Sequence, residues 1–375
     1  MKVLFINSVC GIGSTGRICT DLADELSAQG HECKIAYGRD GFVPEEYRKY
    51  AVRIGSDLDV KVHAVRSRVL DDHGCGSVRA TRKFLKWADA YQPDLLWLHN
   101  IHGYYLNYPM LFAWIKKHPD MEVRWTLHDC WTFTGHCCHF SAINCQKWKS
   151  GCHHCPRLED YPKSMGRDHS RENYRKKKEA FCGVPHMTIY TPSQWLADLV
   201  KQSFLREYPV EVHYNFVDPE IFKPTASDFR QEHGLEQQKI VLGVASTWDE
   251  RKGLSGFCEL ARKLGPAYRV VLVGLNQEQI SQLPDSMLGL PRTHDLQQLA
   301  QIYSAADVFV NLSLEETFGM TTVEAVQCGT PAIVYQGTAC EEIANQYPGC
   351  LAVEADPEQV YQAILQTTAK QDMKR

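Results

Sequence analysis

The stretch MKVLFINSVCGIGSTG, residues 1–16, is the part of the sequence that decides the fold. Val3–Asn7 is an apolar run that predicts a buried strand, and three glycines follow it in a G-x-G-x-x-G pattern. The amphipathic segment Arg17–Gln29 then predicts a helix, and Gly30 stands at a position typical of a helix C-cap. Strand, glycine-rich turn and helix in this order predict an α/β unit whose turn can bring backbone N–H groups close to an anion.

The same alternation of strand and helix continues along the chain and predicts parallel sheets covered by helices on both faces. The further strands are expected at Cys33–Tyr37, Leu95–His99, Val123–His128, Met187–Thr191, Ile240–Val244, Val270–Val273, Val308–Leu312 and Ala332–Tyr335. The further helices are expected at Val78–Tyr91, Tyr108–His118, Gln194–Ser203, Gly253–Leu264, Leu296–Ser304, Thr322–Cys328 and Pro357–Thr368.

A break in this rhythm at Tyr214–Pro224 predicts a domain boundary. We therefore expect an N-terminal domain at residues 1–214, with a Cys-rich insert at 130–170, and a C-terminal domain at residues 215–375. Open α/β sheets bind ligands at the carboxyl ends of their strands, so the expected active site is a cleft between the two domains.

Length and composition agree with this plan. A chain of 375 residues is long enough for two cores, and 44% hydrophobic and 23% charged residues are typical of a soluble globular protein. A formal net charge of -4 gives no reason to expect nucleic acid as a partner. We find no apolar run of the roughly 20 residues that a spanning helix needs, and no signal peptide, so we expect a cytoplasmic protein.

Charged residues in the second half are placed for binding a phosphorylated ligand. Arg251 and Lys252 come where the helix after Ile240–Val244 begins, and two such cations suit a diphosphate. Glu316 and Glu324 lie eight residues apart across the next helix start, so they can address two ends of one ligand, a sugar ring and a ribose. Taken alone, the Arg-Lys pair is better interpreted as a solvated basic pair at a loop.

The string from Glu316 to Pro331 resembles the donor-site signature of glycosyltransferase family 4, whose members are retaining enzymes with the GT-B fold. The resemblance covers nearly the whole chain and includes the glycine-rich loop, Thr126–Asp129, Asn215–Asp218 and Ala305–Val310. Through residues 132–137 and 305–311 the sequence is similar to bacterial enzymes of exopolysaccharide or capsule assembly, of the colanic-acid type. The resemblance implies an α/β GT-B fold with two Rossmann-like domains facing a central cleft.

The resemblance also implies roles for individual residues. His128 and Glu316 would act at the reacting centre. The residues implied to bind the donor are Gly13, Ser246, Arg251, Lys252, Phe318, Gly319, Met320, Thr321 and Glu324. The donor would be a UDP- or GDP-linked sugar, and the acceptor a glycan or a polyprenyl-diphosphate-linked glycan. No catalytic metal is expected, because fixed cations can stabilise the leaving diphosphate and Asp57-Leu58-Asp59 is better interpreted as a helix start than as a metal-binding motif.

Other functions stay open at this point. An NAD(P)-dependent oxidoreductase should carry an acidic residue after its second strand, where this sequence has Tyr37-Gly38-Arg39. An epimerase on the same two-domain scaffold, or a non-catalytic binder of nucleotide sugars, would share the fold. The plain structural interpretation of His128 is a strand-end histidine with local hydrogen bonds.

Six of the 15 cysteines lie between Cys130 and Cys155. Cys152 and Cys155 have the two-residue spacing that lets two thiolates reach one ion. Relatives that share the insert imply Cys137 and Cys145 as the second pair, and the four would hold a structural zinc. Reduced thiols that hold nothing, or disulfides, are the alternatives.

Two basic runs suggest contact with an anionic membrane. The first is Arg79, Arg82, Lys83 and Lys86, and the second is Arg171, Arg175, Lys176, Lys177 and Lys178. The first run falls at helical spacing, so the sequence predicts either two solvated helix faces or a peripheral contact with the inner leaflet of the cell membrane.

Overall fold

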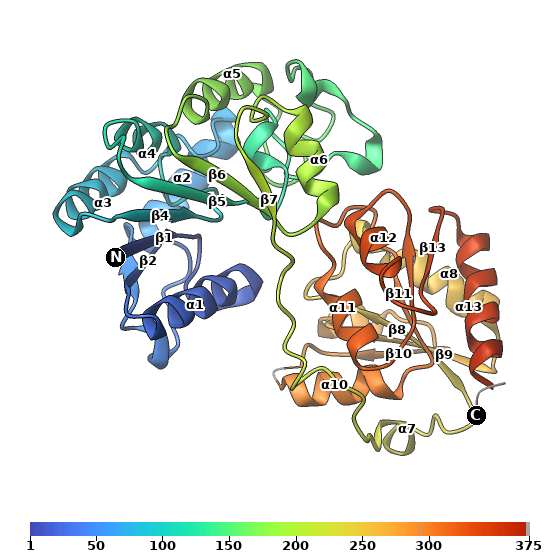
Figure 1. Cartoon of the computed structure of the whole chain (residues 1–375). Coiled ribbons are helices and arrows are strands. Elements are labelled where there is room, and N and C mark those ends of the chain that lie inside the picture. Colours follow the sequence, from blue (N-terminus) through green and yellow to red (C-terminus); the bar gives the residue numbers. More distant parts are fainter. Residues whose placement is uncertain (294, 373–375) are drawn as a thin grey trace. The chain divides into compact units, whose positions relative to one another are not determined.

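The computed structural model describes residues 1–293 and 295–372, and the chain divides into two compact units, Met1–His213 and Tyr214–Arg375 (Figure 1). The division lies one residue before the predicted boundary. Each unit is built on its own parallel sheet with helices on its faces. The expected α/β class, with two Rossmann-like units, is confirmed.

The sheet of the first unit has the strand order β3-β2-β1-β4-β5-β6-β7, with every pair parallel. Its strands are β1 Lys2–Ile6, β2 Glu32–Tyr37, β3 Ala51–Arg53, β4 Leu95–Leu98, β5 Glu122–Thr126, β6 Met187–Thr191 and β7 Val210–Val212. Its helices are α1 Gly13–Ala28, α2 Asp57–Leu70, α3 Val78–Tyr91, α4 Tyr108–Ile115, α5 Ser170–Phe181 and α6 Gln194–Gln202.

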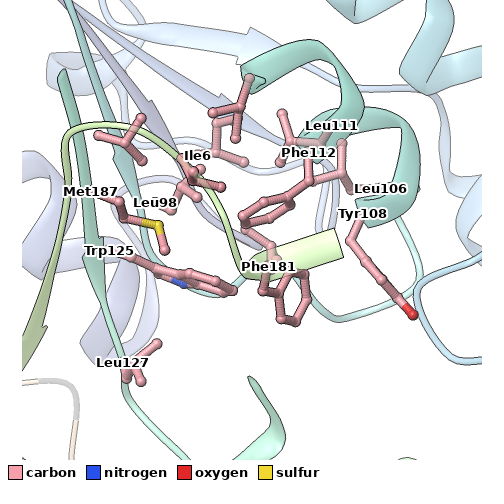
Figure 2. Packing of buried hydrophobic residues seen from close by; sticks show 14 of the residues in the cluster. Ile6, Leu98, Leu106, Tyr108, Leu111, Phe112, Trp125, Leu127, Phe181 and Met187 are labelled. Atoms are coloured by element: carbon pink, nitrogen blue, oxygen red, sulfur yellow. The ribbon is translucent and has the colours of Figure 1, made fainter. Parts of the chain in front are cut away.

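The larger core of the first unit lies between the sheet and the helices α3, α4 and α5, and a smaller core lies between the sheet and α1. Strand β4 is fully buried and β1 is buried from Val3 onward, since a parallel sheet is covered on both faces and its strands are therefore largely apolar. Figure 2 shows Trp125 of β5 and Phe112 of α4 meeting Phe181 at the end of α5. This contact fixes the strands whose carboxyl ends carry the residues described below.

The sheet of the second unit has the order β10-β9-β8-β11-β12-β13, again all parallel. Its strands are β8 Lys239–Val244, β9 Tyr268–Val273, β10 Met287–Leu290, β11 Val308–Asn311, β12 Ala332–Tyr335 and β13 Leu351–Val353. Its helices are α7 Phe229–Glu232, α8 Leu254–Leu264, α9 Gln277–Ser281, α10 Leu296–Ala305, α11 Met320–Gln327, α12 Ala339–Ala344 and α13 Pro357–Asp372.

The direction of chain progression reverses once in each sheet. In the first unit this happens between β1 and β4, and in the second unit between β8 and β11. Helices that follow the two strands of such a pair leave on opposite faces, so the loops separate and open a ligand site at the carboxyl ends. The predicted site residues should therefore be sought beside these two strand pairs.

Asp57-Leu58-Asp59 begins helix α2, as predicted. The Ser56 hydroxyl accepts a hydrogen bond from the Asp59 N–H, and the Asp59 carboxylate accepts one from the Ser56 N–H, which is a capping box. The acidic pair is thus used in starting a helix. None of the helices in the described part of the chain is long and apolar enough to cross a membrane.

Candidate functional site

Two loops meet at the carboxyl ends of β8 and β11, the switch point of the second sheet. The loop after β8 is held by the buried Trp248, whose indole N–H donates to the Val273 carbonyl at 2.9 Å. Gly274, which follows β9, lets the loop after β8 pass close by, because a Cβ on residue 274 would lie 1.7 Å from the carbonyl oxygen of Ala245. Ser246, between the two held positions Ala245 and Trp248, is exposed.

Arg251 and Lys252 lie in a single 3₁₀ turn, Glu250–Lys252, at the start of α8. The Asp249 carboxylate caps this turn by accepting the Lys252 N–H at 2.9 Å. Gly253 ends the turn with φ +78°, and a Cβ there would meet the Leu312 side chain at 2.5 Å. The cationic turn is therefore fixed against the residue that follows β11.

Lys252 and Glu316 form an ion pair, Nζ to Oε1, between the loop after β8 and the loop after β11. The Lys252 and Glu316 side chains are 20% and 17% exposed, so the pair is partly shielded but reachable from solvent. The Arg251 carbonyl also accepts the Leu314 N–H at 3.2 Å, which joins the same two loops through the backbone. The structure thus brings together two of the residues predicted to act on the donor.

Gly319 takes up φ +91° and precedes the first turn of α11, which begins at Met320. Phe318 is buried, and a Cβ on Gly319 would lie 2.4 Å from the Cys340 sulfur, so only glycine fits. No side chain caps this helix start, which makes it a place where backbone N–H groups and the helix dipole favour an anion. Thr321 lies in the first turn.

Glu324 lies one turn further along α11, where its Oε2 accepts a hydrogen bond from the Tyr303 hydroxyl at 2.8 Å. Tyr303 is fully buried, and burial raises the pKa of its phenol well above the usual value, so the hydroxyl keeps its proton and donates it. The Glu324 carboxylate is therefore held in one orientation by the core of the unit.

Gly13 is the first residue of α1 and follows β1, beside the switch point of the first sheet. It is exposed, it has φ +64°, and a Cβ there would meet nothing within 4 Å. Gly16 is glycine for another reason, since a Cβ there would lie 3.2 Å from the Gly11 nitrogen. The first turn of α1 is therefore tightly wound, with open space above Gly13.

His128 lies two residues beyond β5, so the strand is shorter than predicted. Its Nε2 is 3.0 Å from Nδ1 of the buried His99, which directly follows β4, and the two rings are stacked. Burial lowers the pKa of His128 to about 4 and that of His99 well below the usual value. Both rings are therefore neutral at neutral pH, and one donates the shared hydrogen bond to the other.

A histidine–aspartate pair follows the same two strands, β4 and β5. His102 Nε2 is 2.8 Å from Asp129 Oδ2, and Asp129 Oδ1 accepts the Trp131 N–H at 2.8 Å. Burial alone would raise the pKa of Asp129, but His102 and this N–H outweigh it and hold the pKa below its usual range. The Tyr161 hydroxyl reaches His102 Nδ1 at 3.3 Å.

The four cysteines predicted to hold zinc lie around one small cavity in the insert. Cys137, Cys145, Cys152 and Cys155 all line it, and all are free thiols. Among residues 1–293 and 295–372, the group of three ligand atoms lying within 4.8 Å of one another is His102, Asp129 and Cys138, a set that sequence reasoning did not predict.

One residue of the second basic run does not belong to a solvated face. Lys177 is buried, and its Nζ donates to the carbonyl oxygens of Trp131 and Thr134 at 2.6 and 3.1 Å. Burial lowers its pKa to about 7. The prediction that Lys177 is part of an exposed run is wrong, because this lysine joins α5 to the start of the insert. The remaining basic residues of both runs are exposed.

Sequence reasoning missed several polar residues of these sites. His99 and His102 follow β4, Asp129 follows β5, and a search for polar residues at strand ends would have found all three. Tyr303 gave no such signal, because it is a buried helix residue known only by its contact with Glu324.

A larger cavity, of about 750 Å³, opens at the opposite end of the second sheet, beside the starts of β12 and β13. Its lining residues in the described part of the chain include none of those predicted to bind the donor. Volume alone does not identify the site, since ligands of open α/β sheets bind at the carboxyl ends of the strands.

Comparison with known families gives two matches. The sequence matches the family described as Glycosyltransferase Family 4 over residues 15–221, which is more than half of the chain, and Glycosyl transferases group 1 over residues 226–375. The second match contains the Lys252 turn, Glu316 and the whole of α11.

Curated relatives match over shorter stretches. The putative colanic acid biosynthesis glycosyl transferase WcaC of Escherichia coli is 34% identical over 112 residues, which is 28% of this chain and 27% of WcaC. The N,N'-diacetylbacillosaminyl-diphospho-undecaprenol alpha-1,3-N-acetylgalactosaminyltransferase of Campylobacter jejuni is 30% identical over 129 residues, 33% of this chain and 34% of that enzyme. The chain thus spans about a quarter to a third of the length of these relatives.

Solved structures match over the whole fold. Sucrose-phosphate synthase from Thermosynechococcus elongatus has a TM-score of 0.68 at 16% identity, covering 98% of this chain and 90% of that one. Anabaena HepE in complex with UDP and glucose has a TM-score of 0.64 at 16% identity, covering 98% and 92%. At this identity the likeness concerns the fold, and it is the GT-B fold that the sequence predicts.

Proposed function

Since this chain belongs to Glycosyltransferase Family 4, we propose that it transfers a sugar from a nucleoside-diphosphate sugar to a glycan or lipid-linked glycan, with retention of the anomeric configuration. The observation that carries the proposal is the ion pair between Lys252 and Glu316 at the switch point of the second sheet. The setting would be bacterial surface polysaccharide synthesis in the cytoplasm, which the likeness to WcaC supports.

The charged groups of the second unit favour one orientation of the donor. The diphosphate would lie between Arg251, Lys252 and the start of α11, where two cations and a helix N-terminus offer complementary charge. The ribose would bond to Glu324, which Tyr303 holds in place at 2.8 Å. The neighbouring Ser246 and the backbone of residues 318–321 would complete the donor contacts. HepE has been solved with UDP and glucose, which supports a UDP-linked donor.

Catalysis would rest on fixed charge. In a retaining transfer the bond to the leaving diphosphate weakens early, so negative charge grows on the phosphate oxygens while positive charge grows on the sugar. Lys252 would stabilise the first charge and Glu316 would contact the sugar. Their mutual contact keeps both side chains in position before the donor arrives, so little reorganisation remains for the reaction. We expect no catalytic metal to be needed.

From the first unit, Gly13 and His128 would complete the reaction site. The proposal for Gly13 is supported by its open backbone at the start of α1. His128 is neutral because burial lowers its pKa to about 4, so it would act as a hydrogen-bond partner of the transferred sugar and not as a cation. These two roles rest on the family resemblance together with the placement of both residues at the carboxyl edge of the first sheet.

The acceptor side is proposed to face an anionic membrane. Helix α2 exposes Leu58, Val62, Val65 and Val69 at spacings of four, three and four residues, which places them on one face. These side chains are 69, 60, 61 and 48% exposed. Helix α3 of the same unit exposes four basic residues, predicted above to meet lipid headgroups. An exposed apolar stripe on one helix and exposed cations on another helix of the same unit suit the surface of an anionic bilayer.

Flotation tests this contact. The chain should co-float with vesicles containing anionic lipid at low salt and not with neutral vesicles. The double variant V62D/V65D should stop floating, whereas F42D, at an exposed apolar residue outside the stripe, should float like the unchanged protein. Failure of the unchanged protein to float would favour an acceptor in solution and would leave the donor proposal untouched.

A thermal-shift screen tests the donor site. Ligand at about 100 times its Kd stabilises a protein by about 2.7 kcal/mol, so one of UDP, GDP or ADP and its sugars should raise Tm clearly. The shift should be smaller in K252A. Stabilisation by NAD(P) alone would instead favour the oxidoreductase. An epimerase would show the same nucleotide shift but would convert the sugar without releasing the diphosphate.

A further inference from the structure

The Cys-rich insert is organised by side chains, because it contains little regular structure. Between β5 and α5 the described backbone forms three short 3₁₀ turns, Trp131–Phe133, Ser141–Ile143 and Lys147–Lys149. Phe133, Phe140 and Trp148 pack together as a small aromatic cluster. Next to this cluster lies the cavity lined by the four cysteines.

The cavity is the size of one small occupant. Its volume is about 20 Å³, close to what a single water molecule requires. Cys137 and Cys155 are hydrogen-bonded to each other, and Cys152 accepts the Gly135 N–H at 3.2 Å. Gly135 is needed for this contact, since a Cβ there would lie 2.6 Å from the Cys152 Cβ. Backbone N–H groups aimed at cysteine sulfur are suited to holding a thiolate.

An independent observation points to a ligand in the same cavity. His136 lines it, its side chain is 0% exposed, and its Nδ1 is 2.6 Å from Asp71 Oδ1. The other ring nitrogen, Nε2, is buried and has no hydrogen-bond partner among the residues that the structure describes. A buried nitrogen of this kind needs an acceptor, a donor or an ion beside it. A histidine backed by a carboxylate is an arrangement common around bound metals.

We propose that Cys137, Cys145, Cys152 and Cys155 bind one structural zinc ion in this cavity, and that His136 Nε2 donates a hydrogen bond to one of the ligating sulfurs. Four protein ligands close the coordination sphere, so the ion would organise the loop and not react. A zinc–sulfur distance of about 2.3 Å requires sulfurs about 3.8 Å apart. Among the described residues, no three of the four sulfurs lie within 4.8 Å of one another, so zinc binding would draw the sulfurs closer together. Each ligating thiol would release its proton to solvent.

The charge around the cavity favours such a site. Zinc with four thiolates carries two net negative charges. Lys147 lines the cavity and donates from Nζ to the carbonyl oxygens of His153 and His154 at 3.0 and 2.8 Å, so a cation is fixed beside the Cys152–Cys155 turn.

Zinc binding in the insert would affect the carboxyl edge of the first sheet through Tyr161. This residue belongs to the insert, and its hydroxyl is 3.3 Å from His102, which holds Asp129 next to His128. Its ring also packs at 5.6 Å from His73. By fixing the insert, zinc would fix the position of Tyr161 against the carboxyl edge of the first sheet.

Elemental analysis of the full chain, purified without a metal-affinity tag, tests the site directly. We expect about one zinc per chain with four-sulfur coordination in X-ray absorption. C152S should lose the zinc, whereas C182S, at a cysteine of the same unit outside the cavity, should keep it. Unchanged protein without metal, or with a disulfide among the four cysteines, would overturn the proposal even if C152S failed to fold.

Hydrogen exchange tests the structural role. Removal of zinc by a mercurial and a chelator should increase exchange in residues 135–169 and leave the second unit unchanged. Equal protection with and without zinc would contradict the claim that the ion organises the insert.

Discussion

Replacing Lys252 by alanine is the perturbation that the donor site makes most informative. Lys252 Nζ contacts Glu316, and both side chains are largely buried at 20% and 17% exposure. Removing one group that stabilises developing charge in such a setting costs about 2.7–4 kcal/mol of transition-state stabilisation. We therefore expect kcat to fall by about 10²–10³-fold in K252A. Folding should change by only about 1 kcal/mol, as for a pair that is still in contact with solvent.

A matched control separates charge from stability. Lys263 also pairs with a glutamate, Glu358, in the same unit, but away from the switch point. The assay is the rate of nucleoside diphosphate release at saturating donor, with Tm recorded for each protein. K263A should retain turnover within about twofold, since an exposed pair contributes little. Turnover of K252A within a few fold of the unchanged protein, at unchanged Tm, would refute the reasoning.

A double-mutant cycle with Glu316 extends the test. The double variant K252A/E316A should be little slower than the slower single variant, because residues that act on one bound donor as a unit are not additive. Fully multiplied losses would mean that the two residues act independently. Near-normal turnover in a well-folded double variant would remove both from the mechanism.

Three further predictions concern folding, the cationic turn and the ribose contact. Burial lowers the pKa of His63 and His128 to about 4 from 6.5. Below pH 6.5 the unfolded chain therefore binds more protons than the folded chain. The free energy of unfolding, measured by denaturant titration, should fall by up to about 3 kcal/mol per histidine between pH 6.5 and 4. Gly253→Ala would place a Cβ 2.5 Å from the Leu312 side chain and should abolish the donor-induced Tm shift. The control Gly234→Ala, where a Cβ meets nothing within 4 Å, should keep the shift and lose about 1–2 kcal/mol of stability. Tyr303→Phe removes a 2.8 Å hydrogen bond of about 0.5–1.5 kcal/mol, so KM for the donor should rise a few fold at nearly constant kcat; an unchanged KM would detach Glu324 from the ribose.

Much of the fold was predictable because its strands are continuous apolar runs. β6, β12 and α3 begin and end where the sequence predicts, whereas α1 begins at Gly13, four residues before the predicted start at Arg17. Three short edge strands were not predicted: β3 Ala51–Arg53, β7 Val210–Val212 and β13 Leu351–Val353 are three-residue segments that are only partly buried. Such edges exist because a neighbouring strand pairs with them, and local sequence carries little of that information.

The residues of the candidate site were predicted better in the second unit than in the first. Lys252 and Glu316 were named from the sequence because a motif surrounds them, and the structure brings them into contact. The His102–Asp129 pair was not, because it joins residues 27 positions apart through the ends of two strands. Lys177 was misassigned for a similar reason: within a run of basic residues, only the packing of α5 decides which lysine points inward.

The measurement that tests the central claim most directly is acceptor-dependent release of nucleoside diphosphate. The donor found by the thermal screen is incubated with the protein, with and without a membrane lipid extract containing polyprenyl-diphosphate-linked glycans. We predict that free nucleoside diphosphate appears, together with a longer lipid-linked glycan, only when the extract is present, and that K252A slows the formation of both by about 10²–10³-fold. Conversion of the donor sugar without release of nucleotide, or release that K252A leaves unchanged, would contradict the assignment of this site to glycosyl transfer.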